Sequence, residues 1–158
     1  MKNILALSAV ALSVVCADEI LSVGDDWENT FEQICDEHGY KHEHHTVITK
    51  DGYKLGMYRI SGKQGASNIG KPPVILQHGI LDSSDGWAMN TVDKSLAFII
   101  SDEAYDVWLS NSRGNKYSRA HISLDPDWDD EFWDFDWEDM GTFDVPANIE
   151  YVKKQTNY

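Results

Sequence analysis

The chain has 158 residues, which is room for one domain with an ordinary hydrophobic core. Its 42% hydrophobic and 25% charged residues exclude an intrinsically disordered chain. The formal net charge of −14 repels nucleic acid and anionic lipid surfaces, so we expect neither as a partner.

The first residues have the pattern of a secretory signal peptide. Lys2 precedes an apolar run from Ile4 to Val15, and the small residue Ala17 stands directly before the polar chain. A membrane anchor is the alternative, but a spanning helix needs roughly 20 apolar residues and this run is shorter. We therefore expect residues 1–17 to be a signal peptide. Residues 18–158 would then form a secreted or lysosomal domain without stable membrane insertion.

Removal of the signal peptide would leave Cys35 as the one cysteine of the chain. It would also remove Lys2 and no acidic residue, which changes the net charge from −14 to −15. In an oxidising compartment, Cys35 either pairs with a cysteine outside this sequence or remains a buried free thiol. The sequence leaves both alternatives open.

The N-terminal part of the domain predicts a short helix and a hairpin. Residues 27–38 favour a helix that ends at Gly39. From His44 to Ile60 the pattern is strand, turn, strand, with turn chemistry at residues 50–52. A polar, glycine-rich loop at residues 61–71 separates this hairpin from the rest of the chain.

The remainder alternates between strands and helices. Residues 74–76 and 105–109 read as strands buried on both faces. Between them, residues 91–103 predict a helix with an apolar face, formed by Leu96, Ile99 and Ile100. Two more helices are expected at about 129–140 and 145–155. This alternation after an opening hairpin predicts an α/β fold, with a sheet that is parallel from the third strand onward.

Six segments carry a family resemblance. They are residues 49–53, 77–81, 95–99, 105–115, 131–140 and 144–147. In this order and spacing they resemble the acid lipases, the family of gastric lipase and lysosomal acid lipase. The resemblance covers about residues 31–155 and implies an α/β-hydrolase fold, represented by the N-terminal portion of its sheet. It also implies an enzyme that cleaves triacylglycerols or steryl esters without a metal or organic cofactor.

The segment 77–81 holds the one catalytic group expected in this chain. Ester hydrolysis passes through a tetrahedral intermediate with a negatively charged oxygen, which backbone N–H donors stabilise. The resemblance places one such donor on the backbone N–H of Ile80. Gly79 lets the backbone approach a substrate closely. The resemblance makes His78 a support for this loop and not the catalytic base.

The sequence contains no Gly-x-Ser-x-Gly motif, the turn that carries the serine nucleophile of this fold. The nearest approach is residues 110–114, where Ser110 replaces the first glycine and no helix is expected to follow directly. Ser112 is therefore not expected to be a nucleophile. The resemblance places the family's serine one strand later, after the helix that ends near Lys154, with the acid and the base still further along. We expect the chain as given to be inactive.

Two clusters of polar residues have alternative interpretations. The adjacent histidines His42, His44 and His45 form either a metal site or a solvated strand edge, and the second is favoured because ligands must converge. The ten acids between Asp125 and Asp144 begin like a calcium loop. This run lacks the glycine and glutamate required at positions six and twelve, which favours an acidic helix face.

Two hypotheses from different classes follow. The chain is an N-terminal fragment of a secreted or lysosomal serine lipase, or it is a catalytically dead secreted module of the same fold that serves as a binding protein or decoy. Substrate preference and oligomeric state are left open by the sequence.

We predict that the signal peptide is removed after Ala17, because Val15 and Ala17 are the small residues that the peptidase reads. Amino-terminal sequencing of the protein collected from the medium of expressing cells should begin at Asp18. Recovery of a chain that retains Met1 would contradict both the cleavage and the secretory assignment.

Overall fold

The computed structural model describes residues 28–158, so the predicted signal peptide lies outside the described residues. Four strands form one sheet: β1 (Tyr40–Ile48), β2 (Lys54–Lys63), β3 (Pro73–Gln77) and β4 (Asp106–Ser110). The principal helices are α2 (Phe31–Glu37), α3 (Leu96–Asp102) and α5 (Val145–Thr156). Shorter helical turns are η1 (Ser84–Trp87), η2 (Asp130–Trp133), α4 (Trp137–Asp139) and the π-helical turn η3 (Met140–Asp144).

The sheet is mixed and has the strand order β1-β2-β4-β3. β1 and β2 form the antiparallel hairpin, and β2 pairs antiparallel with β4. β3 and β4 are parallel, with Val74 opposite Val107 and Leu76 opposite Leu109. The predicted hairpin and the parallel pairing of the third and fourth strands are therefore confirmed.

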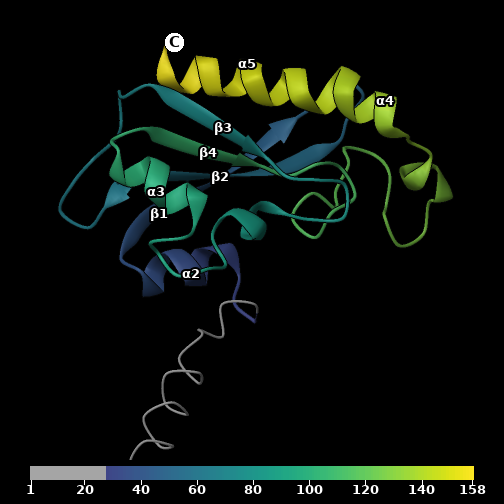
Figure 1. Cartoon of the computed structure of the whole chain (residues 1–158). Coiled ribbons are helices and arrows are strands. Elements are labelled where there is room, and N and C mark those ends of the chain that lie inside the picture. The colour runs from purple at the N-terminus through teal and green to yellow at the C-terminus, as the bar shows by residue number, and fades with distance from the viewer. Residues whose placement is uncertain (1–27) are drawn as a thin grey trace, which may run out of the picture.

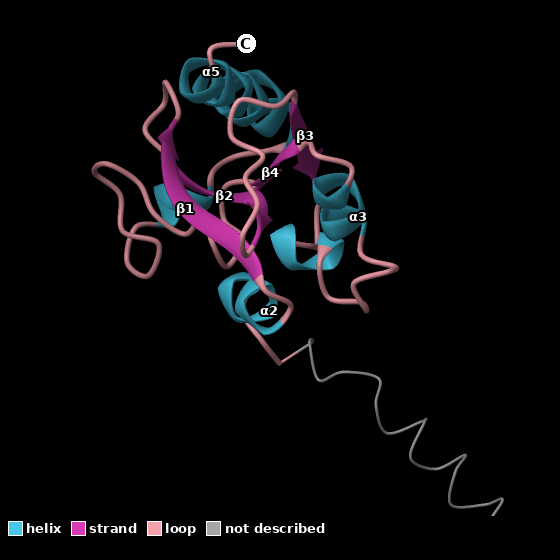
Figure 2. Ribbon diagram, turned by 90° about the vertical axis from the view of Figure 1, so that its left-hand side faces the viewer, coloured by secondary structure: helices cyan, strands magenta, loops and turns pink. Residues whose placement is uncertain are grey.

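Helices cover both faces of this sheet. Figure 1 shows α5 along one face, with α2 and α3 on the other, and Figure 2 shows the same layers from the side. Alternate residues of the central strands supply the two cores, so that Tyr58 and Val107 lie under α2 and α3 while Met57 and Trp108 lie under α5. Within residues 28–158 no helix combines the length and apolar character that a membrane crossing requires.

The predicted hairpin turn is confirmed, and the helix predicted at residues 27–38 exists but begins only at Phe31, while residue 27 lies outside the described residues. The Thr30 hydroxyl accepts a hydrogen bond from the backbone N–H of Gln33, and the Gln33 side chain accepts one from the backbone N–H of Thr30, so that this capping box starts α2. The hairpin turn requires Gly52, which has a φ of +103°. A Cβ at this position would lie 2.5 Å from the His121 ring.

The helix predicted at residues 91–103 is shorter, and its predicted apolar face is only partly correct, because Ile100 packs against the core while Leu96 and Ile99 are exposed. α3 begins at Leu96, after turns that the buried Ser95 hydroxyl stabilises by donating to the carbonyls of Ala88 and Asn90. Leu96 is 41% exposed and Ile99 is 40% exposed. The buried residues are Ala97, Phe98 and Ser101. Phe98 stacks on Tyr40 with ring centroids 4.2 Å apart, and this tertiary contact sets the rotation of the helix.

The helix predicted at about 129–140 does not exist as one element. η2 ends at Trp133, and a new helix starts at Trp137 because the Asp136 carboxylate accepts the N–H groups of Glu138 and Asp139. That helix continues through η3 into α5, which confirms the prediction for residues 145–155. The acids of this segment thus lie in a loop and at helix starts, where negative charge is favourable, and not along one helix face.

The burial predicted for the third strand is only partly correct. All five residues of β4 are buried because β4 has a neighbour on each side. β3 lies at the edge of the sheet, and its outer edge has no partner strand within residues 28–158. Val74 and Ile75 are consequently half-buried, although their sequence is that of a fully buried strand.

We predict that residues 18–158, expressed alone, form an expanded and self-associating protein. The open edge of β3 presents unpaired backbone groups beside apolar side chains, a combination that recruits other chains, although a net charge near −15 opposes association. Sedimentation velocity and thermal unfolding should show oligomers and a broad transition, with binding of a hydrophobic dye. A sharp, cooperative transition from a monomer would contradict this prediction.

Candidate active site

The loops that follow β3 and β4 lie side by side, because these strands are parallel and end at the same edge of the sheet. The loop after β3 contains residues 78–83, including Ile80. The loop after β4 contains residues 111–118. Few regular elements hold these loops, so side-chain hydrogen bonds between them fix their positions.

His78 is the central contact between the two loops. It is buried, and its Nε2 atom accepts hydrogen bonds from the backbone N–H of Ser112 and from Nδ2 of Asn115, each at 3.1 Å. The other ring nitrogen, Nδ1, lies 2.5 Å from the carbonyl oxygen of Gly79. His78 therefore contacts loop backbone on both sides.

Two further side chains join the loops. Gln77 donates from Nε2 to the Ser112 hydroxyl at 3.0 Å. The buried Asn111 accepts the backbone N–H of Ser84 at 2.9 Å and donates to the carbonyl of Gly56 at 3.1 Å. The loop after β3 is thus attached at both of its ends to the start of the loop after β4.

A cavity of about 470 Å³ opens beside this junction. Its lining includes His78, Gly79 and Ile80 from the loop after β3, together with Trp137 and Met140. Ile80 is 54% exposed, and its backbone N–H donates to no acceptor among the described residues. A Cβ on Gly79 would meet nothing within 4 Å, so the space above this peptide is open. An unoccupied backbone donor therefore borders a largely apolar cavity.

Ser112 does not have the surroundings of a nucleophile. Its hydroxyl accepts a hydrogen bond from Gln77, while only its backbone N–H reaches His78. A nucleophilic serine needs a base within hydrogen-bond reach of its hydroxyl, and in this fold a helix follows the serine directly in the chain. Turns and bends follow Ser112 instead. These observations agree with the prediction, made from the sequence, that Ser112 is not a nucleophile.

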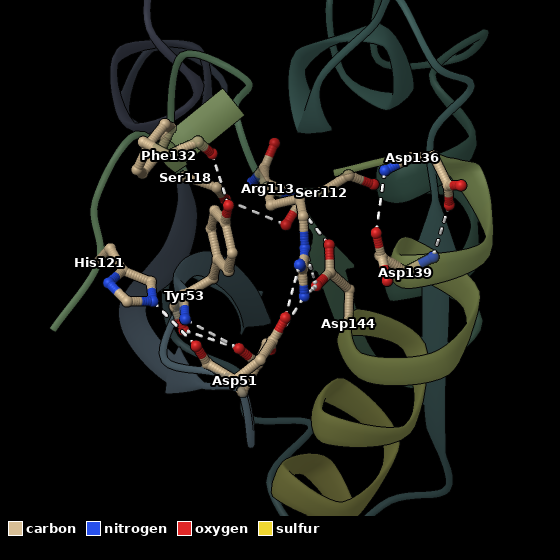
Figure 3. Close-up of polar contacts among 12 residues, drawn as sticks. Asp51, Tyr53, Ser112, Arg113, Ser118, His121, Phe132, Asp136, Asp139 and Asp144 are labelled. Carbon is tan, nitrogen blue, oxygen red and sulfur yellow. Dashed lines mark hydrogen bonds and ion pairs between the residues drawn. The ribbon is translucent and has the colours of Figure 1, made fainter. Parts of the chain in front are cut away.

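A buried arginine fixes the loop after β4 to two other segments. The guanidinium of Arg113 lies between Asp51, in the hairpin turn, and Asp144, at the end of η3, as Figure 3 shows. It meets Asp51 at 2.7 and 3.0 Å and Asp144 at 2.8 Å, and the Arg113 backbone N–H also donates to Asp144. The Tyr53 ring lies 3.9 Å from the guanidinium carbon.

The pKa of Asp51 reflects this contact. Burial raises the pKa of this carboxyl, but hydrogen bonds from Arg113 and Thr49 outweigh burial and hold it below its usual value. A lowered folded-state pKa stabilises the fold above the unfolded-state pKa, and the stabilisation is lost as the pH falls through the folded-state value. The hairpin turn therefore keeps its ion pair in a mildly acidic compartment.

The three adjacent histidines contact separate groups. His42 pairs with Asp36 at 3.2 Å, His44 stacks on Tyr58, and His45 bonds the Tyr151 hydroxyl at 3.0 Å. Among residues 28–158 no group of three or more metal-ligating side chains converges. These histidines lie on the edge strand β1, in agreement with the strand edge that the sequence analysis favoured.

Two carboxylates at the start of the acidic run, those of Asp125 and Asp129, bond to backbone N–H groups of the same run. The Asp129 carboxylate accepts a hydrogen bond from the backbone N–H of Asp125, and the Asp125 carboxylate accepts one from that of Asp127, so these side chains stabilise a local turn.

Cys35 is a buried free thiol. Burial, together with the charges of Asp36 and Glu32, raises the pKa of this thiol far above its usual range, which makes it unreactive.

Sequence reasoning missed the roles of Asn115, Asn111 and Arg113. All three lie within the segment 105–115 that resembles the acid lipases, but that resemblance assigned them no function. The available signal was their position, because polar residues directly after a buried strand reach the edge where parallel strands end.

Comparisons with known proteins agree with this geometry. Residues 31–91 match the family model of a partial alpha/beta-hydrolase lipase region, and residues 72–158 match that of the alpha/beta hydrolase fold. Lipase 1 of Drosophila melanogaster is 45% identical over 137 residues, which is 87% of this chain and 30% of that protein. The gastric triacylglycerol lipases of Mus musculus and Homo sapiens are 48% and 46% identical, over 75% of this chain and 30% of each lipase.

The chain thus spans about 30% of the length of these curated relatives. Among solved structures, the Pyrococcus furiosus esterase Pf2001 matches 84% of this chain and 40% of its own, with 19% identity and a TM-score of 0.47.

We predict that Arg113→Ala lowers the free energy of unfolding of the full-length gene product by about 3–5 kcal/mol, because Asp144 would remain buried without its partner. Arg119→Ala is the matched control, since Arg119 pairs with Asp127 at the surface and should contribute less than about 1 kcal/mol. Urea unfolding monitored by tryptophan fluorescence measures both. Equal effects of the two substitutions would contradict the role of the buried cluster.

Proposed function

We propose a lipase function for this chain, which belongs to the alpha/beta-hydrolase family and corresponds to the N-terminal region of the acid lipases. In this proposal the chain supplies one half of the oxyanion hole of a serine ester hydrolase that acts on triacylglycerols or steryl esters. The relatives named as triacylglycerol lipases support this substrate class.

The observation that carries the proposal is the free N–H of Ile80 beside an apolar cavity. When a nucleophile attacks the ester carbonyl, negative charge develops on the carbonyl oxygen. A preorganised backbone donor stabilises this charge more than it stabilises the neutral ester, and the barrier falls. The apolar lining from Trp137 and Met140 suits the hydrocarbon part of a lipid ester.

The nucleophile, the acid and the base would come from a part of the protein beyond the present sequence. The 30% coverage of the relatives supports this division, as does the lack of a Gly-x-Ser-x-Gly motif in these 158 residues. Residues 1–17 would direct the protein to secretion or to the lysosome. Residues 18–158 would form part of the hydrolase domain and have no esterase activity alone, because one oxyanion donor forms no acyl-enzyme.

The second candidate function is a catalytically dead binding module or decoy of the same fold. The lack of a nucleophile motif in the sequence is the observation that favours it. Sequencing of mature transcripts across the Tyr158 codon separates the two. An open reading frame that continues through Gly-x-Ser-x-Gly supports the lipase, and a stop codon directly after Tyr158 supports the module.

We predict that Ile80→Pro lowers the kcat of the full-length product on a p-nitrophenyl ester by about 10²–10³-fold, because proline lacks the N–H donor. Ile80→Ala keeps the donor and should keep most of the activity. Leu81→Pro is the matched control for the effect of proline on this loop, since Leu81 is 98% exposed.

Equal activity of Ile80→Pro and Ile80→Ala would contradict the assignment of this donor. The isolated residues 18–158 form a further arm of the same assay. Hydrolysis by this fragment that Ser112→Ala abolishes would contradict the exclusion of Ser112.

A further inference from the structure

We infer that Asn115 is a positioning residue for the oxyanion donor, a role that rests on the proposed ester hydrolase function. Among the described residues, Asn115 makes no hydrogen bond with the Gly79–Ile80 peptide that carries the donor. It acts through His78, which contacts both Asn115 and the carbonyl oxygen of Gly79.

The amide of Asn115 is held in one orientation. Its Oδ1 atom accepts the backbone N–H of Tyr117 at 3.0 Å, so the amino group points the other way. Both N–H bonds of that group have acceptors, with Nδ2 at 3.1 Å from His78 Nε2 and at 2.9 Å from Asn111 Oδ1. The amide therefore presents a donor, and not an acceptor, to the His78 ring.

This donor selects the tautomer of His78. A ring nitrogen that accepts hydrogen bonds carries no proton, and Nε2 accepts from both Asn115 and the backbone N–H of Ser112. The proton of the neutral ring then resides on Nδ1. Of the two donors that fix this state, only Asn115 is a side chain.

The protonated Nδ1 in turn orients one peptide group. It donates to the carbonyl oxygen of Gly79 at 2.5 Å, and the Asp82 N–H donates to the same oxygen at 3.1 Å. This carbonyl and the Ile80 N–H belong to one planar trans peptide, so they point in opposite directions. Holding the Gly79 carbonyl against His78 therefore aims the Ile80 N–H away from the ring.

The opposite tautomer would reverse this effect. A bare Nδ1 would place its lone pair against the Gly79 oxygen, and the two acceptors would repel each other. The peptide would rotate away and take the Ile80 N–H with it. Asn115 thus stabilises the orientation in which the donor is available to a developing oxyanion.

Two substitutions in the full-length gene product separate this role from simple packing. Asn115→Asp preserves the shape of the side chain but, as a carboxylate, presents an acceptor to Nε2 and demands a proton there. Asn115→Ala removes the donor without adding an acceptor. We expect kcat to fall about tenfold in Asn115→Ala and about a hundredfold in Asn115→Asp, with KM nearly unchanged. A role that depends on side-chain shape alone gives the opposite order, because Asp has the same shape as Asn. Repulsion between the new carboxylate and Asn111 Oδ1 would give the same order, and the tautomer of His78 distinguishes that case.

Nitrogen NMR of ¹⁵N-histidine-labelled protein reads the tautomer directly, at about one pH unit above the ordinary imidazole pKa. The wild-type His78 should carry its proton on Nδ1, with Nε2 bare, and Asn115→Asp should show a protonated Nε2. Asn90→Asp is the matched control, because it makes the same change of charge at an exposed asparagine and should alter neither kcat nor the His78 signals.

A bare Nε2 in Asn115→Asp, or a milder loss of kcat in Asn115→Asp than in Asn115→Ala, overturns the inference. The proposed function fails separately. If the wild-type protein hydrolyses no ester but its His78 signals change as expected, the function is wrong and the hydrogen-bond chain from Asn115 to the Gly79–Ile80 peptide stands.

Discussion

The buried guanidinium of Arg113 is the constraint on which the rest of the site depends. A charge in the interior of low polarity must be paired, and Arg113 is paired with Asp51 and Asp144. These partners come from the hairpin turn and from the start of the long C-terminal helix. The three segments therefore cannot separate without exposing or orphaning a charge. The residue before Arg113 donates its backbone N–H to His78, so the geometry of the loop after β3 begins at this cluster.

The loop after β3, which carries Ile80, has little regular structure of its own, and its neighbours determine its shape. Parallel pairing of β3 and β4 brings the two following loops together, and His78 and Asn111 then join them. The same parallel arrangement leaves the outer edge of β3 unpaired within residues 28–158. The candidate donor thus lies next to the least protected part of the sheet.

The errors of sequence interpretation share one cause, which is that local patterns do not report which surface a segment packs against. The aromatic and acidic run at 129–140 has helical spacing, yet Asp136 caps a new helix and divides it. In α3 the apolar Leu96 and Ile99 are exposed, since stacking of Phe98 on Tyr40 turns the helix toward the sheet. The β3 strand has the composition of an interior strand but lies at the edge of the described sheet.

The sequence by itself determined the elements whose local chemistry is strong. The capped helix α2, the turn at Gly52, the buried strand β4 and the loop that carries Ile80 all follow from short-range patterns or from motifs in order. The prediction that Ser112 is not a nucleophile was equally local, because Ser110 replaces the first glycine of the Gly-x-Ser-x-Gly motif. Only the tertiary structure decided which side chains meet. Asp51 and Arg113 are 62 residues apart, and no local pattern links them. Asn115 and His78 are 37 residues apart, and they meet because two parallel strands end at one edge of the sheet.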